Sequence, residues 1–321
     1  MKKPLKLALA LLVPAALLML ATAESQQKTL KIAFSIPGFK FPFFRIMESG
    51  AKAEAAKLSG VEILSMDGGD DDATQLSLCE NGIASGIDGM VIAPRTTEGL
   101  AGCFKALSEK NIPVITVDRR AANPSDSLGH IGADNVKGGE AAAKFIVKRI
   151  KSKGNVIELL GTAGASPAID RSKGFNNIIS RSKNVKVVAQ QTANFDSAKA
   201  LQVTEDILTK LGSTKDKPGF DALFAANDDM ALGALEAIKA RGIDPKKIVV
   251  VGFDTLESAL QSIEKGELTA TIDQFPNKQA GNAVAAVVDF IRNKKAPAKT
   301  LLLTPIVLSQ QNIKDASTRA K

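Results

Sequence analysis

The sequence predicts an α/β protein with two similar doubly wound lobes, each a parallel sheet with helices on both faces. From Leu30 onward, short apolar and β-branched runs alternate with longer stretches of helical period. This alternation is typical of parallel sheets covered by helices. The 321 residues also hold more candidate strands than one open sheet comfortably takes, so the chain is expected to divide into two lobes.

The candidate strands fall into two series along the chain. The first contains Leu30–Ser35, Val61–Ser65, Gly89–Ile92, Val114–Val117 and Leu128–Ile131. The second contains Val156–Leu160, Val185–Ala189, Ala222–Phe224, Ile248–Val251, Thr269–Ile272 and Leu301–Val307. The expected helices include Phe43–Leu58, Lys137–Ile150, Ala198–Leu211, Met230–Ala240 and Lys278–Arg292. A hinge is expected near Gly132–Asn135, and the polar tail Lys314–Lys321 is expected to be loose.

The first 23 residues are expected to be a secretory signal peptide. A basic start is followed by an apolar run from Leu7 to Leu20 and then by Ala21-Thr-Ala23, a typical cleavage site. The apolar run is shorter than the roughly 20 residues of a comfortable membrane span, and no cysteine near the cut offers a lipid anchor. We therefore expect a soluble protein in the periplasm.

Export makes a disulfide possible between the two cysteines, Cys79 and Cys103. Both fall in candidate helices among apolar neighbours. One interpretation is a bridge between adjacent helices on one side of a sheet. The other is a pair of buried thiols that pack as small hydrophobic groups. The sequence leaves both open.

Composition argues against several functional classes. The single histidine, His130, excludes a His-rich metal site, and no Gly-x-Gly fingerprint or Gly-Lys phosphate loop occurs. The acidic run Asp70–Asp72 lacks the spaced ligands and closing Glu of a calcium loop and predicts a solvated loop and helix start. We expect neither metal, cofactor nor catalysis. The net charge of +8 includes three leader lysines and is too diffuse to indicate nucleic acid.

Candidate site residues follow the strands, because open parallel sheets bind ligands beyond the carboxyl ends of their strands. In the first series these residues are Phe41, Phe43, Phe44, Arg45, Ala93, Arg95, Asp118 and Arg119. In the second series they are Arg171, Phe195, Asn227, Asp254 and Gln274. Charged and amide groups of this kind bond sugar hydroxyls, and phenylalanines cover the C–H faces of a sugar ring. The alternative for the Asp and Asn residues is that they only cap the helices that follow.

The same segments resemble a known family, the periplasmic sugar-binding proteins of ABC transporters, most closely the ribose-binding group. The resemblance runs from about Lys31 to Leu308. It is carried by Phe41-Pro-Phe-Phe44, Ile112-Pro-Val-Ile-Thr-Val-Asp-Arg119, His130-Ile-Gly-Ala-Asp-Asn135, Asp170-Arg-Ser-Lys-Gly-Phe175, Asn194-Phe-Asp196, Phe224-Ala-Ala-Asn-Asp-Asp-Met-Ala-Leu-Gly-Ala234, Val250-Val-Gly-Phe-Asp254 and Ala270-Thr-Ile-Asp-Gln274.

The resemblance implies a type I periplasmic binding protein with three hinge crossings, near Ala133, Asp273 and Leu303. The N-terminal lobe would then comprise residues 28–133 and 274–303, and the C-terminal lobe residues 134–273 and 304–321. Phe43, Phe44 and Phe195 would enclose the sugar ring. Its hydroxyls would bond Asp118, Arg119, Arg171, Asn227, Asp254 and Gln274. The implied function is capture of a monosaccharide for an ABC permease by a monomer that is not an enzyme.

Two departures from the ribose-binding pattern bear on the ligand. Phe41 and Ala93 stand where that pattern has asparagines. Since an unpaired buried hydroxyl costs about 1–3 kcal/mol, we expect another pentose, a furanose hexose, a deoxy sugar or a polyol in place of ribose. Arg45 or Arg95 would reach in to serve that ligand, or Arg45 is simply a solvated helix residue.

Two other functions use the same bilobal core. Repressors of the lac repressor family carry a DNA-binding helix-turn-helix before this core. Here the roughly 30 residues before the first strand are interpreted as a signal peptide, so no helix-turn-helix is expected. The second alternative is a receptor that presents its ligand to a chemoreceptor or sensor kinase. The sequence does not separate that role from transport.

Overall fold

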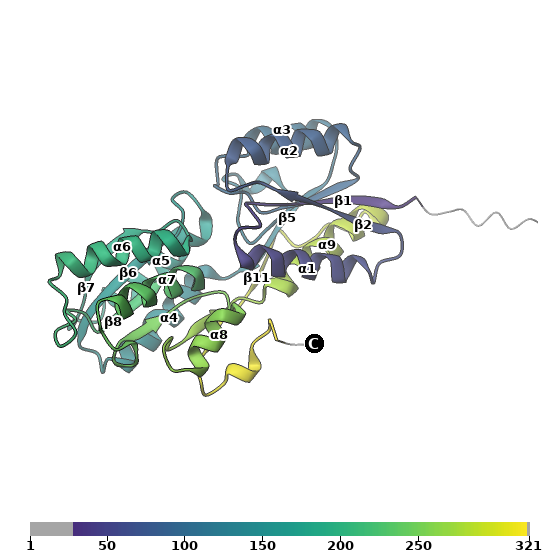
Figure 1. Ribbon diagram of the computed structural model, residues 1–321. Coiled ribbons are helices and arrows are strands. Elements are labelled where there is room, and N and C mark those ends of the chain that lie inside the picture. Colours follow the sequence, from purple (N-terminus) through teal and green to yellow (C-terminus); the bar gives the residue numbers. More distant parts are fainter. Residues whose placement is uncertain (1–27, 320–321) are drawn as a thin grey trace, which may run out of the picture.

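The computed structural model describes residues 28–319, which form two α/β lobes side by side (Figure 1). The predicted fold class is confirmed. The expected signal peptide, residues 1–23, lies outside the described residues. None of the helices between residues 28 and 319 combines the length and the apolar character needed to cross a bilayer.

The N-terminal lobe is built on a six-stranded parallel sheet in the order β11-β5-β4-β3-β1-β2. Its strands are β1 (Leu30–Ile36), β2 (Val61–Asp67), β3 (Gly89–Ile92), β4 (Val114–Val117), β5 (Gly129–Ala133) and β11 (Thr300–Leu303). Helices α1 (Pro42–Ala55) and α9 (Pro276–Asn293) cover one face, and α2 (Asp72–Ala84) and α3 (Ala101–Glu109) the other (Figure 1). Because β3 and β4 lie between these layers, every residue in them is buried.

The C-terminal lobe has a four-stranded parallel sheet in the order β7-β6-β8-β9. The antiparallel pair β10–β12 extends it through a bridge between Val251 and Ala270. The strands are β6 (Gly154–Leu160), β7 (Val185–Thr192), β8 (Ala222–Ala225), β9 (Val249–Val251), β10 (Thr271–Asp273) and β12 (Ile306–Leu308). The helices are α4 (Asn135–Arg149), α5 (Ser166–Ile179), α6 (Ser197–Lys210), α7 (Asp228–Ala240) and α8 (Glu257–Glu264).

The chain passes between the lobes three times: from β5 to α4, from β10 to α9, and from β11 to β12. The expectation of a single strand over Leu301–Val307 was wrong. That segment forms β11 in one lobe and β12 in the other. Pro305 lies between them, and a proline has no N–H to donate to a strand ladder.

The expectation of a loose tail was also wrong, for the described residues up to 319. Ala316 is buried in a small cluster with Leu260 and Leu308. Arg319 pairs with Glu257 and Glu264 of α8 at 2.7 and 2.6 Å. Residues of the tail therefore pack on the C-terminal lobe.

Close packing of α4 on α5 depends on two glycines. A Cβ on Gly139 would lie 2.1 Å from the carbonyl oxygen of Arg171, and one on Gly174 would lie 2.0 Å from that of Val136. No side chain fits in either place. The two glycines therefore let α5 approach α4 closely enough to hold Arg171 against the start of α4.

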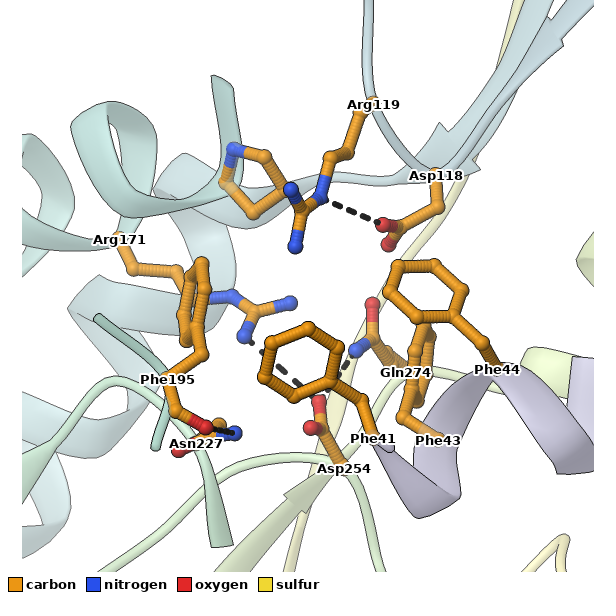
Figure 2. Close-up of a pocket in the computed structure, with 11 residues that line it drawn as sticks. Phe41, Phe43, Phe44, Asp118, Arg119, Arg171, Phe195, Asn227, Asp254 and Gln274 are labelled. Atoms are coloured by element: carbon orange, nitrogen blue, oxygen red, sulfur yellow. Dashed lines mark hydrogen bonds and ion pairs between the residues drawn. The ribbon is translucent and has the colours of Figure 1, made fainter. Parts of the chain in front are cut away.

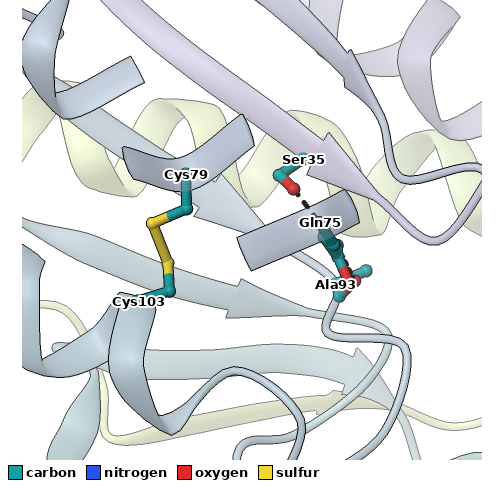
Figure 3. The surroundings of a disulfide bond; sticks show 5 residues. All are labelled: Ser35, Gln75, Cys79, Ala93 and Cys103. Carbon is teal, nitrogen blue, oxygen red and sulfur yellow. Dashed lines mark hydrogen bonds between the residues drawn. A yellow bond between two sulfur atoms is a disulfide. The ribbon is translucent and has the colours of Figure 1, made fainter. Parts of the chain in front are cut away.

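A disulfide between Cys79 and Cys103 joins α2 to α3 (Figure 3). One helical turn before Cys79, the buried Gln75 donates to the carbonyl of Ala93 at 2.9 Å and to Ser35 Oγ at 3.1 Å. Its Oε1 accepts from the N–H of Arg95 at 2.9 Å. The bridged helix therefore holds the loop that follows β3.

Reduction of the disulfide is expected to destabilise the protein by about 3 kcal/mol, because the bridge closes a loop with a sequence separation of 24 residues. Alkylation and intact-mass analysis of the exported protein without reductant should find no free thiol. Urea unfolding with and without reductant should then give the difference in stability. Two alkylated thiols in the unreduced protein would contradict the bridge.

Candidate functional site

A cavity lies between the lobes, at the carboxyl ends of their strands (Figure 2). Its lining comprises Phe41, Phe43, Phe44, Asp118, Arg119, Pro167, Arg171, Phe195, Asn227, Asp254 and Gln274. All nine principal candidates from the sequence, together with Phe41, line this one cavity. Pro167 was not among the residues expected from the sequence, although it lies in the first turn of α5, the helix that follows β6.

Three weaker candidates do not line the cavity. Arg45 is exposed on α1, where its guanidinium lies 5.2 Å from the ring centre of Phe39. The solvated interpretation of Arg45 is therefore the correct one. Ala93 is buried outside the lining.

Arg95 points to an acidic pair instead of the cavity. Its Nε lies 3.0 Å from Asp70 and its Nη1 lies 3.1 Å from Asp72. The acidic run was expected to be solvated, but these two carboxylates fix an arginine, while Asp71 caps α2 as expected of a helix start. Neither Arg45 nor Arg95 therefore lines the cavity, contrary to the expectation that one of them reaches into it.

Four phenylalanines supply apolar walls on two sides of the cavity. Pro42 starts α1, which places Phe41 just before the helix and Phe43 and Phe44 in its first turn. The rings of Phe43 and Phe44 meet edge to face at 5.3 Å. Phe195 lies on the opposite side (Figure 2), and its ring passes so close to Gly161 that a Cβ there would lie 2.1 Å away.

Four charged side chains line the same cavity, each only 3–4% exposed. Arg119 Nε lies 3.7 Å from Asp118 Oδ2, and Arg171 Nη1 lies 3.6 Å from Asp254 Oδ1 (Figure 2). Two carboxylates therefore face two guanidiniums, and their formal charges cancel. The guanidinium of Arg119 also lies 5.3 Å from the ring centre of Phe44 and 5.4 Å from that of Phe195.

Burial disfavours the charged form of each of these groups. It raises the pKa of Asp118, although Arg119 and Arg171 oppose the shift. It also raises the pKa of Asp254 well above its usual range, against the opposing charge of Arg171. Burial lowers the pKa of Arg119 to about 10, against the opposing charge of Asp118. New hydrogen bonds to the charged forms would offset these costs.

Among the residues that line the cavity, two have a buried polar atom without a hydrogen-bond partner in residues 28–319: Asp118 Oδ1 and Arg119 Nε. One is an acceptor and the other a donor. Unpaired buried groups are rare in folded proteins and costly. Both belong to residues that line the cavity, so a bound hydroxyl group would satisfy each of them.

The amides of the cavity have partners within the protein. Asn227 Oδ1 accepts from the N–H of Met230 at 2.9 Å, so Asn227 caps helix α7, as the alternative interpretation expected. The same residue also lines the cavity. Gln274 Nε2 donates to Asp254 Oδ1 at 2.5 Å. This bond holds the Asp254 carboxylate from the side opposite Arg171 (Figure 2).

Three lining residues have left-handed backbone: Asp118 at φ 58°, Phe195 at φ 60° and Asp254 at φ 117°. Such conformations cost about 1–3 kcal/mol each in residues with a side chain, and they cluster at binding and catalytic sites. The cavity therefore combines buried charge with backbone strain.

The lobes meet at the edge of the cavity. The N–H of Thr97 donates to the carbonyl of Gly164 at 3.0 Å, and the N–H of Arg120 donates to Ser166 Oγ at 2.9 Å. The guanidinium of Arg120 also pairs with Asp170. Each contact joins the N-terminal lobe to the C-terminal lobe, so this is a closed arrangement.

Comparison with known proteins agrees with this architecture. The family model of the periplasmic binding protein domain matches residues 32–295. The chain is 35% identical to the ribose import binding protein RbsB of Haemophilus influenzae over 90% of its own length and 94% of the relative.

Two solved structures are similar across most of their length. The crystal structure of the Caulobacter myo-inositol binding protein bound to myo-inositol has a TM-score of 0.83 at 34% identity, covering 91% of this chain and 97% of that one. A fructose-binding periplasmic domain of a hybrid two-component system has a TM-score of 0.82 at 26% identity, covering 90% of this chain and 94% of that one.

One further carboxyl group lies near the cavity, that of Asp228 beside Asn227. It is fully buried, with Oδ1 2.7 Å from Thr271 Oγ1, and its Oδ2 accepts from the N–H of Leu256 at 2.9 Å. Burial raises the pKa of Asp228 to about 8, although these hydrogen bonds oppose the shift. An unfolded aspartate titrates near pH 4.

Stability is expected to fall as the pH rises from about 4 to about 8, because in this window the folded protein holds a proton on Asp228 that the unfolded chain has lost. This one group contributes a loss of about 1.4 kcal/mol per pH unit. Asp228→Asn should remove that contribution, as urea unfolding of both proteins across the range will measure. The exposed Asp206→Asn is the control. Parallel stability profiles for the parent and Asp228→Asn would contradict the assignment.

Proposed function

The chain belongs to the periplasmic binding protein family, and from this premise we propose that it captures one small neutral sugar or polyol. The ligand would be enclosed between the two lobes in the periplasm and delivered to an ABC permease. The observation that carries the proposal is the cavity with two buried carboxylates and two buried guanidiniums. The signal peptide expected over residues 1–23 supports the location.

The chemistry of the lining matches a polyhydroxy ligand. Carboxylates accept hydrogen bonds from hydroxyl groups, and guanidiniums donate to them. Phenylalanines on two sides of the cavity suit the apolar C–H faces of a sugar ring. Since the four charges cancel, a charged ligand would leave one net charge buried, which is costly. A neutral ligand is therefore favoured.

Closure follows from the division of these groups between the lobes. Asp118 and Arg119 follow β4 of the N-terminal lobe, while Arg171 and Asp254 belong to the C-terminal lobe. A ligand that bonds both sets has a higher affinity for the closed form than for the open form. The proposal includes no covalent chemistry, and the names of the relatives describe binding and import.

Presentation of the ligand to a sensor kinase is the second candidate function. It is favoured by the similarity to the fructose-binding domain of a two-component system. Uptake of labelled ligand in cells that lack this chain separates the two roles. Loss of uptake supports delivery to a permease, whereas normal uptake with loss of transcriptional response supports signalling.

A thermal-shift screen of the protein tests ligand capture directly. The panel contains D-ribose, D-allose, L-arabinose, D-fructose, xylitol and myo-inositol, with D-galacturonate as the charged comparison. A ligand at 100 times its Kd should stabilise the protein by about 2.7 kcal/mol. Stabilisation by galacturonate alone, or by no compound of the panel, would contradict the proposal.

Asp254→Ala is expected to abolish useful binding while the protein stays folded. The variant removes a buried charged acceptor, so that Arg171 loses its ion-pair partner and Gln274 Nε2 loses its acceptor, which typically costs about 2–5 kcal/mol. The Kd measured by calorimetry should rise roughly 30-fold to several thousand-fold. Asp206→Ala makes the same charge change on the exposed face of α6 and serves as the control. Near-normal affinity in Asp254→Ala would remove this residue from the site.

Ribose is not expected to be the tightest ligand, because Phe41 lines the cavity with an apolar ring. Phe41→Asn should increase the affinity for D-ribose by restoring a polar group, and Phe41→Leu, which keeps an apolar side chain, should not. Calorimetry on the three proteins gives the comparison. The expectation fails if the parent already binds ribose at least as tightly as every other compound in the screen.

A further inference from the structure

The last described residues of the chain contact the two segments that carry Asp254 and Gln274. Ser317 donates twice to the side chain of Asp273: its Oγ to Oδ1 and its N–H to Oδ2, each at 2.7 Å. The hydroxyl of Thr318 donates to the carbonyl of Thr255 at 2.8 Å. Asp273 and Thr255 are the chain neighbours of Gln274 and Asp254, respectively.

Asp273 connects the tail to the backbone around Gln274. It is fully buried, and besides the tail its Oδ1 accepts from the N–H of Phe275 at 2.9 Å. Phe275 has left-handed backbone at φ 60°. The carboxylate of Asp273 therefore fixes the turn that contains Gln274, whose amide bonds Asp254 at 2.5 Å.

Thr255 connects the tail to the backbone around Asp254. Both residues have positive φ, 60° for Thr255 and 117° for Asp254, and a β-branched residue rarely adopts this conformation. Such a turn persists only when its surroundings determine it. Thr318 holds the carbonyl of Thr255, and Thr271 Oγ1 accepts from its N–H at 3.3 Å.

We propose that Ser317 and Thr318 are positioning residues of the ligand site, which hold Gln274 and Asp254 in their binding geometry through Asp273 and Thr255. The inference rests on the proposed function, since it concerns the same cavity. It assigns the tail a role in affinity. A tail that only stabilises the fold would not change the geometry of these two segments.

Hydrogen exchange of the ligand-free protein tests the positioning step by itself. In the double variant Ser317→Ala/Thr318→Val, amides of residues 252–257 and 271–275 should exchange at least about fivefold faster. Amides of the N-terminal sheet should keep the parent rates. Arg319→Gln removes the ion pairs of the same tail with Glu257 and Glu264 and is the matched control. Ser317→Thr, which keeps the hydroxyl, should show slower exchange at residues 271–275 than Ser317→Ala.

Calorimetry with D-ribose and myo-inositol then tests the effect on affinity. For whichever of the two the parent binds, the Kd of the double variant should rise at least about fivefold, with little change in Arg319→Gln. Parent-like exchange in both segments, or a Kd that changes no more than in the control, would overturn the proposal. If the double variant exchanges faster in these segments but the parent binds no compound of the wider screen, the result supports positioning and contradicts the proposed function.

Discussion

Burial of two carboxylates and two guanidiniums in one cavity is the constraint on which the arrangement of both lobes depends. Asp118, Arg119, Arg171 and Asp254 are almost fully inaccessible, and the two ion pairs among them are longer than hydrogen bonds. Such groups are costly without strong partners. A molecule with several hydroxyl groups supplies donors and acceptors to both pairs, so its binding stabilises the closed form.

The rest of the structure holds these charged groups in place. Arg119 donates to the carbonyl of Arg95 at 2.7 Å, and the N–H of Arg95 donates to Gln75 Oε1. Gln75 lies one helical turn from the disulfide. On the other side, glycines at the α4–α5 contact place Arg171. The cavity is therefore supported from within each lobe, while the three chain crossings between the lobes allow them to move relative to one another.

Much of the fold and the cavity follows from the sequence by one rule. Parallel strands end at a common edge, so residues that directly follow strands, such as Asp118 and Asp254, come together although they are distant in the chain. The rule says nothing about where long side chains point. Arg95 also follows a strand, but Asp70 and Asp72 bind it away from the cavity.

Other errors arose where tertiary contacts decide local structure. The apolar composition of Leu301–Val307 has the pattern of one strand, and only the position of Pro305 at a hinge crossing divides it. The polar composition of the tail suggested a loose segment, yet Ser317 and Arg319 find buried or charged partners on the C-terminal lobe. These partners are remote in sequence, so composition cannot reveal them.

A crystal structure of the protein with the tightest-binding compound of the screen tests the central claim most directly. The account predicts ligand hydroxyls within hydrogen-bond distance of Asp118 or Arg119 from one lobe and of Arg171 or Asp254 from the other. It also predicts that Asp118 Oδ1 and Arg119 Nε, which lack partners among residues 28–319, gain them. A ligand bound by one lobe only, or at another place on the surface, would contradict the account.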